Sequence, residues 1–160
     1  MQNRKKNVFI VFIISIVCLL AAFFVFLNGK SKYQLVLESR ETGHIVKEWT
    51  VSPGDCVKLS FTMSIYKCPQ SEVFTVSKDG RLFLQENVIS LYEAAQYYSW
   101  DNAFSMGEDG WFHAPVNEFV ERVDFPMGFI ANHHVDVRDT VFYVSEVAHG
   151  GEKMTLRILS

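Results

Sequence analysis

The pattern of hydrophobic and polar positions changes near residue 28 of this chain. Residues 8–27 are apolar apart from one serine and read VFIVFIISIVCLLAAFFVFL. At about 1.5 Å per residue, a helix of this length is about 30 Å long, which matches the hydrocarbon thickness of a membrane. The remainder has the mixed composition of a globular domain. The pattern therefore predicts a basic end and transmembrane anchor in residues 1–30, followed by one domain over residues 31–160.

Within residues 31–160, apolar and polar positions alternate with the period of two that is typical of strands. Strands are expected over residues 33–38, 45–51, 57–63, 73–76, 82–84, 119–125, 134–137, 140–147 and 153–159. The sequence Lys78, Asp79, Gly80 is typical of a hairpin turn. Many short strands with regular turns predict an all-β fold, an antiparallel sandwich or small barrel preceded by one N-terminal transmembrane helix.

The segment 91–104 lacks this alternation and predicts a helical turn or a long ordered loop. Aromatic side chains are frequent here and in the residues that follow. They either cap an open end of the β core or line a ligand site. The binding candidates in this region are Tyr92, Tyr97, Trp100 and Trp111.

Charges on the two sides of the apolar run predict its orientation. Arg4, Lys5 and Lys6 precede it, and a segment with several glutamates follows it. Because basic residues favour the cytoplasmic side, the N-terminus is expected in the cytoplasm and the domain outside it. The run is longer than the apolar core of a cleaved signal peptide, which favours a retained signal anchor and a single-pass protein of the cell membrane.

The predicted domain is acidic. Four of the 15 Lys and Arg residues precede residue 31, which leaves 11 against all 18 Asp and Glu residues, a formal charge of −7. No basic stripe is present to neutralise phosphates, so nucleic acid is not an expected partner. The expected partners are the membrane and, from the resemblance described below, transporter subunits.

No motif typical of catalysis, dinucleotide binding or metal binding occurs in the sequence. We therefore expect no enzyme activity, no cofactor and no metal site. Adjacent His133 and His134 would point to opposite faces of a strand, which is poor geometry for sharing a metal. For Cys56 and Cys68, a disulfide and a pair of free thiols both remain open, because the two residues flank one expected strand.

Glu72 is the polar residue of most interest in the strand region. In an alternating strand it shares a face with Phe74 and Val76, which would point into the core. A buried carboxylate without a partner is costly, so we expect Glu72 to pair with Lys67 or with the backbone near Ser64. Ser64 and Glu72 complete the set of binding candidates.

Three segments resemble a family of small bacterial extracytoplasmic domains of unknown function that are encoded beside TRAP (tripartite ATP-independent periplasmic) transporters. In residues 59–76, Ser64, Ile65, Pro69 and Glu72 fit the family pattern, and Met63 replaces its histidine. The segment LYEAA, residues 91–95, stands in place of a glycine-containing turn. Residues 108–111, the strand at residue 134 and the stretch 153–159 resemble its closing strands. The resemblance implies a role near solute transport, without an established reaction.

Two alternative functions therefore follow from the sequence. The first is a membrane-anchored extracytoplasmic domain that binds without catalysis, as an accessory to a TRAP-type solute transporter. The second is a ligand-binding or enzymatic module that uses the aromatic segment 91–112 and the turn near Ser64 and Glu72. A deep pocket in which Glu72, His113 and the tyrosines converge would favour the second.

The orientation can be tested by labelling. In a chain whose own three cysteines are replaced by serine, a membrane-impermeant thiol reagent should label Ser160→Cys in intact cells, or in spheroplasts if an outer membrane is present. The same chain without the new cysteine is the control. Labelling of Ser160→Cys only after lysis would contradict an extracytoplasmic domain.

Overall fold

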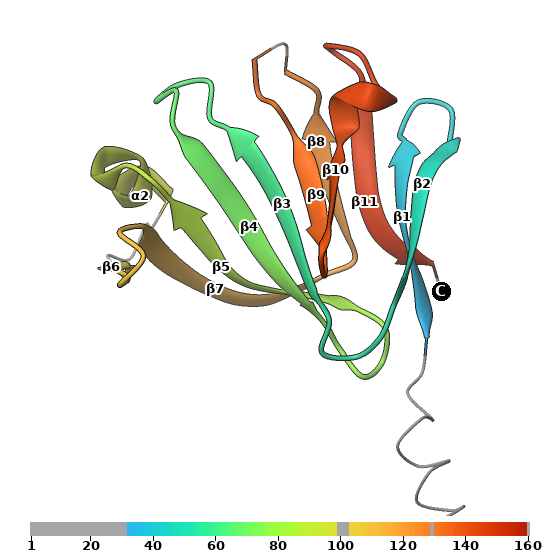
Figure 1. Cartoon of the computed structure of the whole chain (residues 1–160), viewed down its shortest axis with the longest axis horizontal. Coiled ribbons are helices and arrows are strands. Elements are labelled where there is room, and N and C mark those ends of the chain that lie inside the picture. The colour runs from blue at the N-terminus through green and yellow to red at the C-terminus, as the bar shows by residue number, and fades with distance from the viewer. Residues whose placement is uncertain (1–31, 99–102, 129, 160) are drawn as a thin grey trace, which may run out of the picture. The chain divides into compact units, whose positions relative to one another are not determined.

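The structure is a computed structural model that describes residues 32–98, 103–128 and 130–159. Lys32–Ser160 form one compact unit. Two antiparallel sheets make up this unit (Figure 1), which confirms the all-β prediction and its sandwich-like arrangement. The predicted membrane helix, residues 8–27, lies outside the described residues. Among the residues that are described, no helix has the length and apolar character needed to cross a bilayer.

The smaller sheet has four strands. Their order is β2 (Ile45–Val51), β1 (Tyr33–Ser39), β11 (Lys153–Leu159) and β8 (Arg122–Pro126). All neighbours are antiparallel. Alternation places Leu35, Leu37 and Leu156 on the inner face of this sheet, where they are fully buried. Val36, which lies between Leu35 and Leu37, is fully buried as well.

The larger sheet has seven strands. Their order is β10 (Thr140–Tyr143), β9 (His134–Val137), β3 (Cys56–Thr62), β4 (Pro69–Val76), β5 (Leu82–Ile89), β7 (Phe112–Val120) and β6 (Ser105–Met106). The short helix α2 (Tyr92–Tyr98) follows β5 and lies beside β5 and β7. A 3₁₀ turn, η1 (Val144–Glu146), follows β10.

The chain crosses from one sheet to the other between β7 and β8. Only Glu121 separates these strands, although β7 belongs to the larger sheet and β8 to the smaller one. The single strand predicted over 119–125 is therefore wrong: it contains the end of β7 and the start of β8. Similarly, the strand predicted over 140–147 ends at Tyr143, where η1 begins.

The apolar core consists of two clusters. The larger cluster fills the space between the sheets and contains Leu35, Leu59, Phe74 and Leu156 among others. The smaller cluster lies beneath α2, where its members are Met63, Cys68, Ile89, Ala94 and Ala95. Phe61 packs against both clusters. The helical turn predicted for segment 91–104 is confirmed as α2, and its two alanines cover this end of the core.

A β-bulge in β5 decides which of its residues face the core. Phe74 of β4 pairs with Leu84, but the preceding Val73 pairs with Glu86, so Gln85 is the extra residue. A bulge shifts the alternation of side chains by one position. Asn87 therefore lies opposite Glu72 on the inner face, whereas Glu86 is directed to the outer face, where it contacts His113.

The completeness of the core predicts that residues 32–160 fold without the N-terminal segment. The fragment should give a far-ultraviolet circular dichroism spectrum dominated by β structure and should unfold in one cooperative step in urea. A mainly helical spectrum, or two separate transitions, would contradict this expectation.

Candidate functional site

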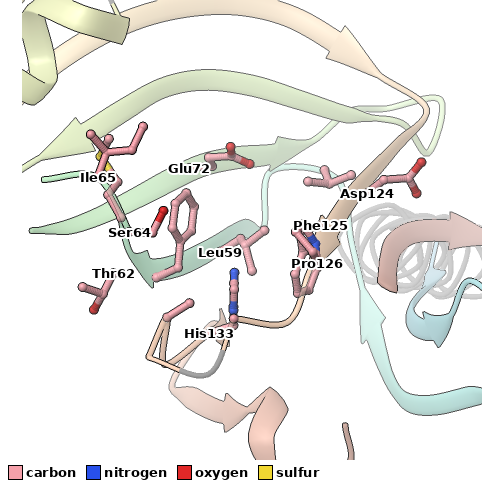
Figure 2. A pocket seen from close by; sticks show the side chains of 14 residues that line it. Leu59, Thr62, Ser64, Ile65, Glu72, Asp124, Phe125, Pro126 and His133 are labelled. Atoms are coloured by element: carbon pink, nitrogen blue, oxygen red, sulfur yellow. The ribbon is translucent and has the colours of Figure 1, made fainter. Parts of the chain in front are cut away.

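A pocket of about 350 Å³ lies where β3 and β4 of the larger sheet face β8 of the smaller sheet. We call it the Glu72 pocket. Its lining is mostly apolar, and Figure 2 shows Glu72 on one side with Phe125 and His133 on the other. The lining residues are Leu59, Phe61, Thr62, Met63, Ser64, Ile65, Glu72, Val123, Asp124, Phe125, Pro126, Gly128, Ala131 and His133.

Two loops form the rim of the Glu72 pocket. The β3–β4 loop contributes Ser64 and Ile65, and the β8–β9 loop contributes Gly128 and Ala131. A backbone hydrogen bond of 2.6 Å from the Thr62 N–H to the Ala131 carbonyl joins the two segments. In Figure 1 both loops lie at the end of the domain opposite to the start of β1. The mouth of the pocket is therefore remote from the point where the preceding chain enters the domain.

Glu72 brings a carboxyl group into this apolar setting. It faces inward, as predicted, because it lies directly opposite buried Leu59 in the β3–β4 ladder. The predicted pairing with Lys67 or the Ser64 backbone is wrong: no hydrogen bond or ion pair joins the Glu72 carboxyl group to any residue that the structure describes. Burial without a compensating partner raises the pKa of Glu72 to about 7.

His133 is the polar residue of the pocket that sequence reasoning missed. Its side chain is 5% exposed, and its ring stacks between Phe61 and Phe125, with centroid separations of 5.4 and 4.9 Å. Burial, and secondarily the neighbouring His134, lowers the pKa of His133 to about 4, so the ring is neutral at physiological pH. Its Nδ1 atom is buried without a hydrogen-bond partner.

Asp124, the other acidic residue of the pocket, is paired with residues that do not line it. The Asp124 carboxylate accepts a hydrogen bond of 2.6 Å from the Thr155 hydroxyl. It also forms ion pairs with Arg40 at 3.4 Å and Arg122 at 3.2 Å. No lysine or arginine lines the pocket. Glu72 is therefore the one lining carboxyl group, among the described residues, without a partner that neutralises it.

Further polar groups on the inner face also lack partners. Asn87, directly opposite Glu72 in the β4–β5 ladder, has a buried side-chain oxygen without a hydrogen bond. Gln70, two residues before Glu72, is 1% exposed, and neither side-chain amide atom is hydrogen-bonded. Buried polar atoms normally have partners, so these unsatisfied groups are unusual, but neither Gln70 nor Asn87 lines the pocket.

The structure brings only two of the predicted binding residues to the pocket, Ser64 and Glu72. Tyr92 instead contacts Phe104 and Phe112, at centroid distances of 5.5 and 5.7 Å. Tyr97 of α2 lies against Tyr66 and is exposed. These two tyrosines and Trp111 do not line the Glu72 pocket. Trp100 lies outside the described residues. The two parts of the predicted site are therefore separate features.

His113 does not converge with Glu72, so the pocket that would have favoured the second function is not formed. His113 lies on the outer face, where its ring nitrogens contact Glu86 at 3.1 Å and Asp109 at 3.2 Å. Desolvation lowers the pKa of His113, but these two carboxylates outweigh it and raise the pKa overall. This cluster links β5 and β7 to the 107–111 turn and is remote from the pocket lining.

Cys56 and Cys68 are both free thiols in the structure, so the alternative of a disulfide is not formed. Cys56 begins β3, and Cys68 immediately precedes β4, at the other end of the hairpin. Strand geometry of about 3.3 Å per residue separates them by roughly 20 Å. Among the described residues, no three His, Cys, Asp or Glu side chains converge as a metal site.

No protein-family model, curated protein or solved structure matches this chain. What this chain can bind is therefore inferred from the geometry and chemistry of the Glu72 pocket.

The partly buried carboxyl group predicts a pH-dependent gain in stability from Glu72→Gln. The pKa of Glu72 is raised from 4.5 to about 7, so the wild-type domain loses stability as the pH rises through that window. The glutamine variant should be close to the wild type in stability near pH 4 and exceed it by about 3 kcal/mol at pH 8. Urea unfolding of residues 32–160 measures this difference.

The matched control is Glu118→Gln, which removes an exposed carboxylate from the same sheet and should change stability little at either pH. An equal effect of Glu72→Gln at pH 4 and pH 8, or a loss of stability at pH 8, would contradict an unpaired carboxyl group.

Proposed function

We propose that this chain is a membrane-anchored, extracytoplasmic domain that binds a small molecule in the Glu72 pocket. One observation carries the proposal: the pocket combines apolar walls with a few polar groups that lack partners within the protein, namely Glu72 and His133. Ligand sites in general have this composition, in which apolar surface provides affinity and sparse polar groups fix orientation. A volume of about 350 Å³ suits a ligand of modest size.

The rigidity of the walls supports binding over a purely structural role. Leu59, Glu72 and Phe125 come from three strands, and the His133 ring is held between two aromatic rings. A site on regular elements is preorganised, so little conformational entropy is lost when the ligand binds. The exposed Ser64 at the rim leaves the pocket open to solvent.

The proposed membrane anchor and the proposed transporter partner are supported by the sequence and by exposed apolar side chains, not by the pocket. The apolar run of residues 8–27 and the basic residues before it support attachment to the cell membrane with the domain outside. The resemblance to domains encoded beside TRAP transporters supports an accessory role in solute uptake. Two apolar side chains near the pocket rim are largely exposed: Ile65 at 71%, and Ile130, which directly precedes Ala131, at 63%. Exposed apolar side chains of this kind suit contact with another protein.

An enzymatic role is the second candidate. A carboxyl group with a pKa of about 7 is matched to general acid–base chemistry near neutral pH. In that case Glu72→Gln would abolish turnover while leaving substrate affinity largely intact. In a binding domain the same substitution changes affinity itself.

Ligand binding can be located with methionine methyl groups. Met63 lines the pocket and is 4% exposed, whereas Met106 on β6 is 64% exposed and remote from the lining. In the full chain held in lipid nanodiscs, water-soluble amphipathic fragments should shift the Met63 methyl resonance in a saturable manner and leave Met106 unchanged. Ser64→Trp places a bulky group at the rim and should weaken binding by about tenfold or more.

Ser105→Trp, on exposed β6, is the matched control and should leave binding unchanged. Shifts confined to Met106, equal binding by both tryptophan variants, or no saturable shift with any fragment would contradict a binding function for this pocket.

A further inference from the structure

The charge of the Glu72 pocket restricts the ligands that it can accept. No basic side chain lines it, and the neutral His133 supplies no positive charge. An anionic ligand would meet the Glu72 carboxyl group without any cation to stabilise it. The net charge of −7 carried by residues 31–160, from 11 basic and 18 acidic residues, also disfavours anions. The ligand is therefore neutral or cationic.

The polar groups without partners favour a ligand that donates hydrogen bonds. The Glu72 carboxylate, which lines the pocket, is an acceptor. The buried Nδ1 of His133 is an acceptor when the proton of the neutral ring is on Nε2. A protonated amine carries several N–H donors and no acceptor, so its hydrogen-bonding capacity complements these two groups.

The walls suit the substituent of such an amine. Leu59 and Phe61 lie on the β3 side and Phe125 on the β8 side. Aromatic faces attract cations in addition to providing apolar contact. A carboxylate enclosed by aromatic and aliphatic side chains can therefore hold both the charged nitrogen and the apolar group attached to it.

We propose that the Glu72 pocket binds an organic amine, whose protonated nitrogen pairs with the Glu72 carboxylate and whose apolar substituent lies against Leu59 and Phe61. The proposal rests on the binding function proposed above and specifies the class of ligand. The amine enters from the solvent through the rim at Ser64.

Binding of this kind releases a proton from Glu72, because the carboxyl group must ionise to pair with the cation. The groups that face Glu72 do not titrate in the relevant range: Leu59 from β3 and Asn87 from β5 are uncharged, and His133 from the β8–β9 loop remains neutral above pH 5. Asp124 of β8 is held by Arg40 and Arg122. The pH dependence of amine binding therefore reports Glu72.

Three probes of similar shape test the proposal: 2-phenylethylammonium, 2-phenylethanol and 3-phenylpropanoate. Their dissociation constants are measured from the Met63 methyl shift of the full chain in nanodiscs. At pH 8 the cation should bind about tenfold or more tightly than the alcohol, and the anion should bind most weakly. With a Glu72 pKa of about 7, the affinity for the cation should fall about tenfold between pH 8 and pH 6.

Glu72→Gln should remove both the preference for the cation and its pH dependence, while Glu118→Gln should retain them. Equal or tighter binding of the alcohol or the anion would overturn the amine proposal and leave the pocket a binding site. Absence of binding by all three probes, together with no hit among the fragments, would overturn the binding function itself. Since the pH series uses the wild-type chain, the test does not depend on the folding of a variant.

Discussion

The carboxyl group of Glu72 is the constraint on which the chemistry of the pocket between the two sheets depends. It lies on the inner face of β4, between a core cluster that contains Phe74 and another that contains Ile89. Open space lies beside it in the pocket, and closing β8 over this group would bury it further without a partner. An apolar side chain at position 72 would make the domain more stable at neutral pH. We therefore attribute the presence of a carboxyl group at this position to ligand binding.

The fold positions this group by a small departure from regular strand geometry. Without the bulge at Gln85, Glu86 would face inward beside Glu72 and two carboxyl groups would compete for the same apolar space. Because of the bulge, the uncharged Asn87 lies opposite Glu72 in place of Glu86. Glu86 instead lies on the outer face, where it contacts His113. On the other side of the pocket, the His133 ring fills the gap between Phe61 and Phe125. The pocket is thus shaped by both sheets.

Much of the fold could be predicted from local patterns, because alternation determines which side of a strand is buried. It located β1, β2, β9 and β11 and placed Glu72 on the inner face. It failed for β7, where Pro115 and the positive backbone angle of Asn117 interrupt the alternation. The absence of a partner for the Glu72 carboxyl group and the role of His133 could not be predicted, since both depend on which distant segments meet. The stacking of His133 between two strands has no signal in its neighbouring residues.

The pKa of Glu72, measured by nuclear magnetic resonance, tests the central claim most directly. In the full chain in nanodiscs without added ligand, the side-chain carboxyl carbon of Glu72 can be assigned by comparison with Glu72→Gln and followed from pH 3 to pH 9. An unpaired carboxyl group in an apolar pocket predicts a midpoint of about 7. A midpoint near the ordinary value of 4.5 would show that water or a cationic side chain already satisfies the group, and would contradict the account.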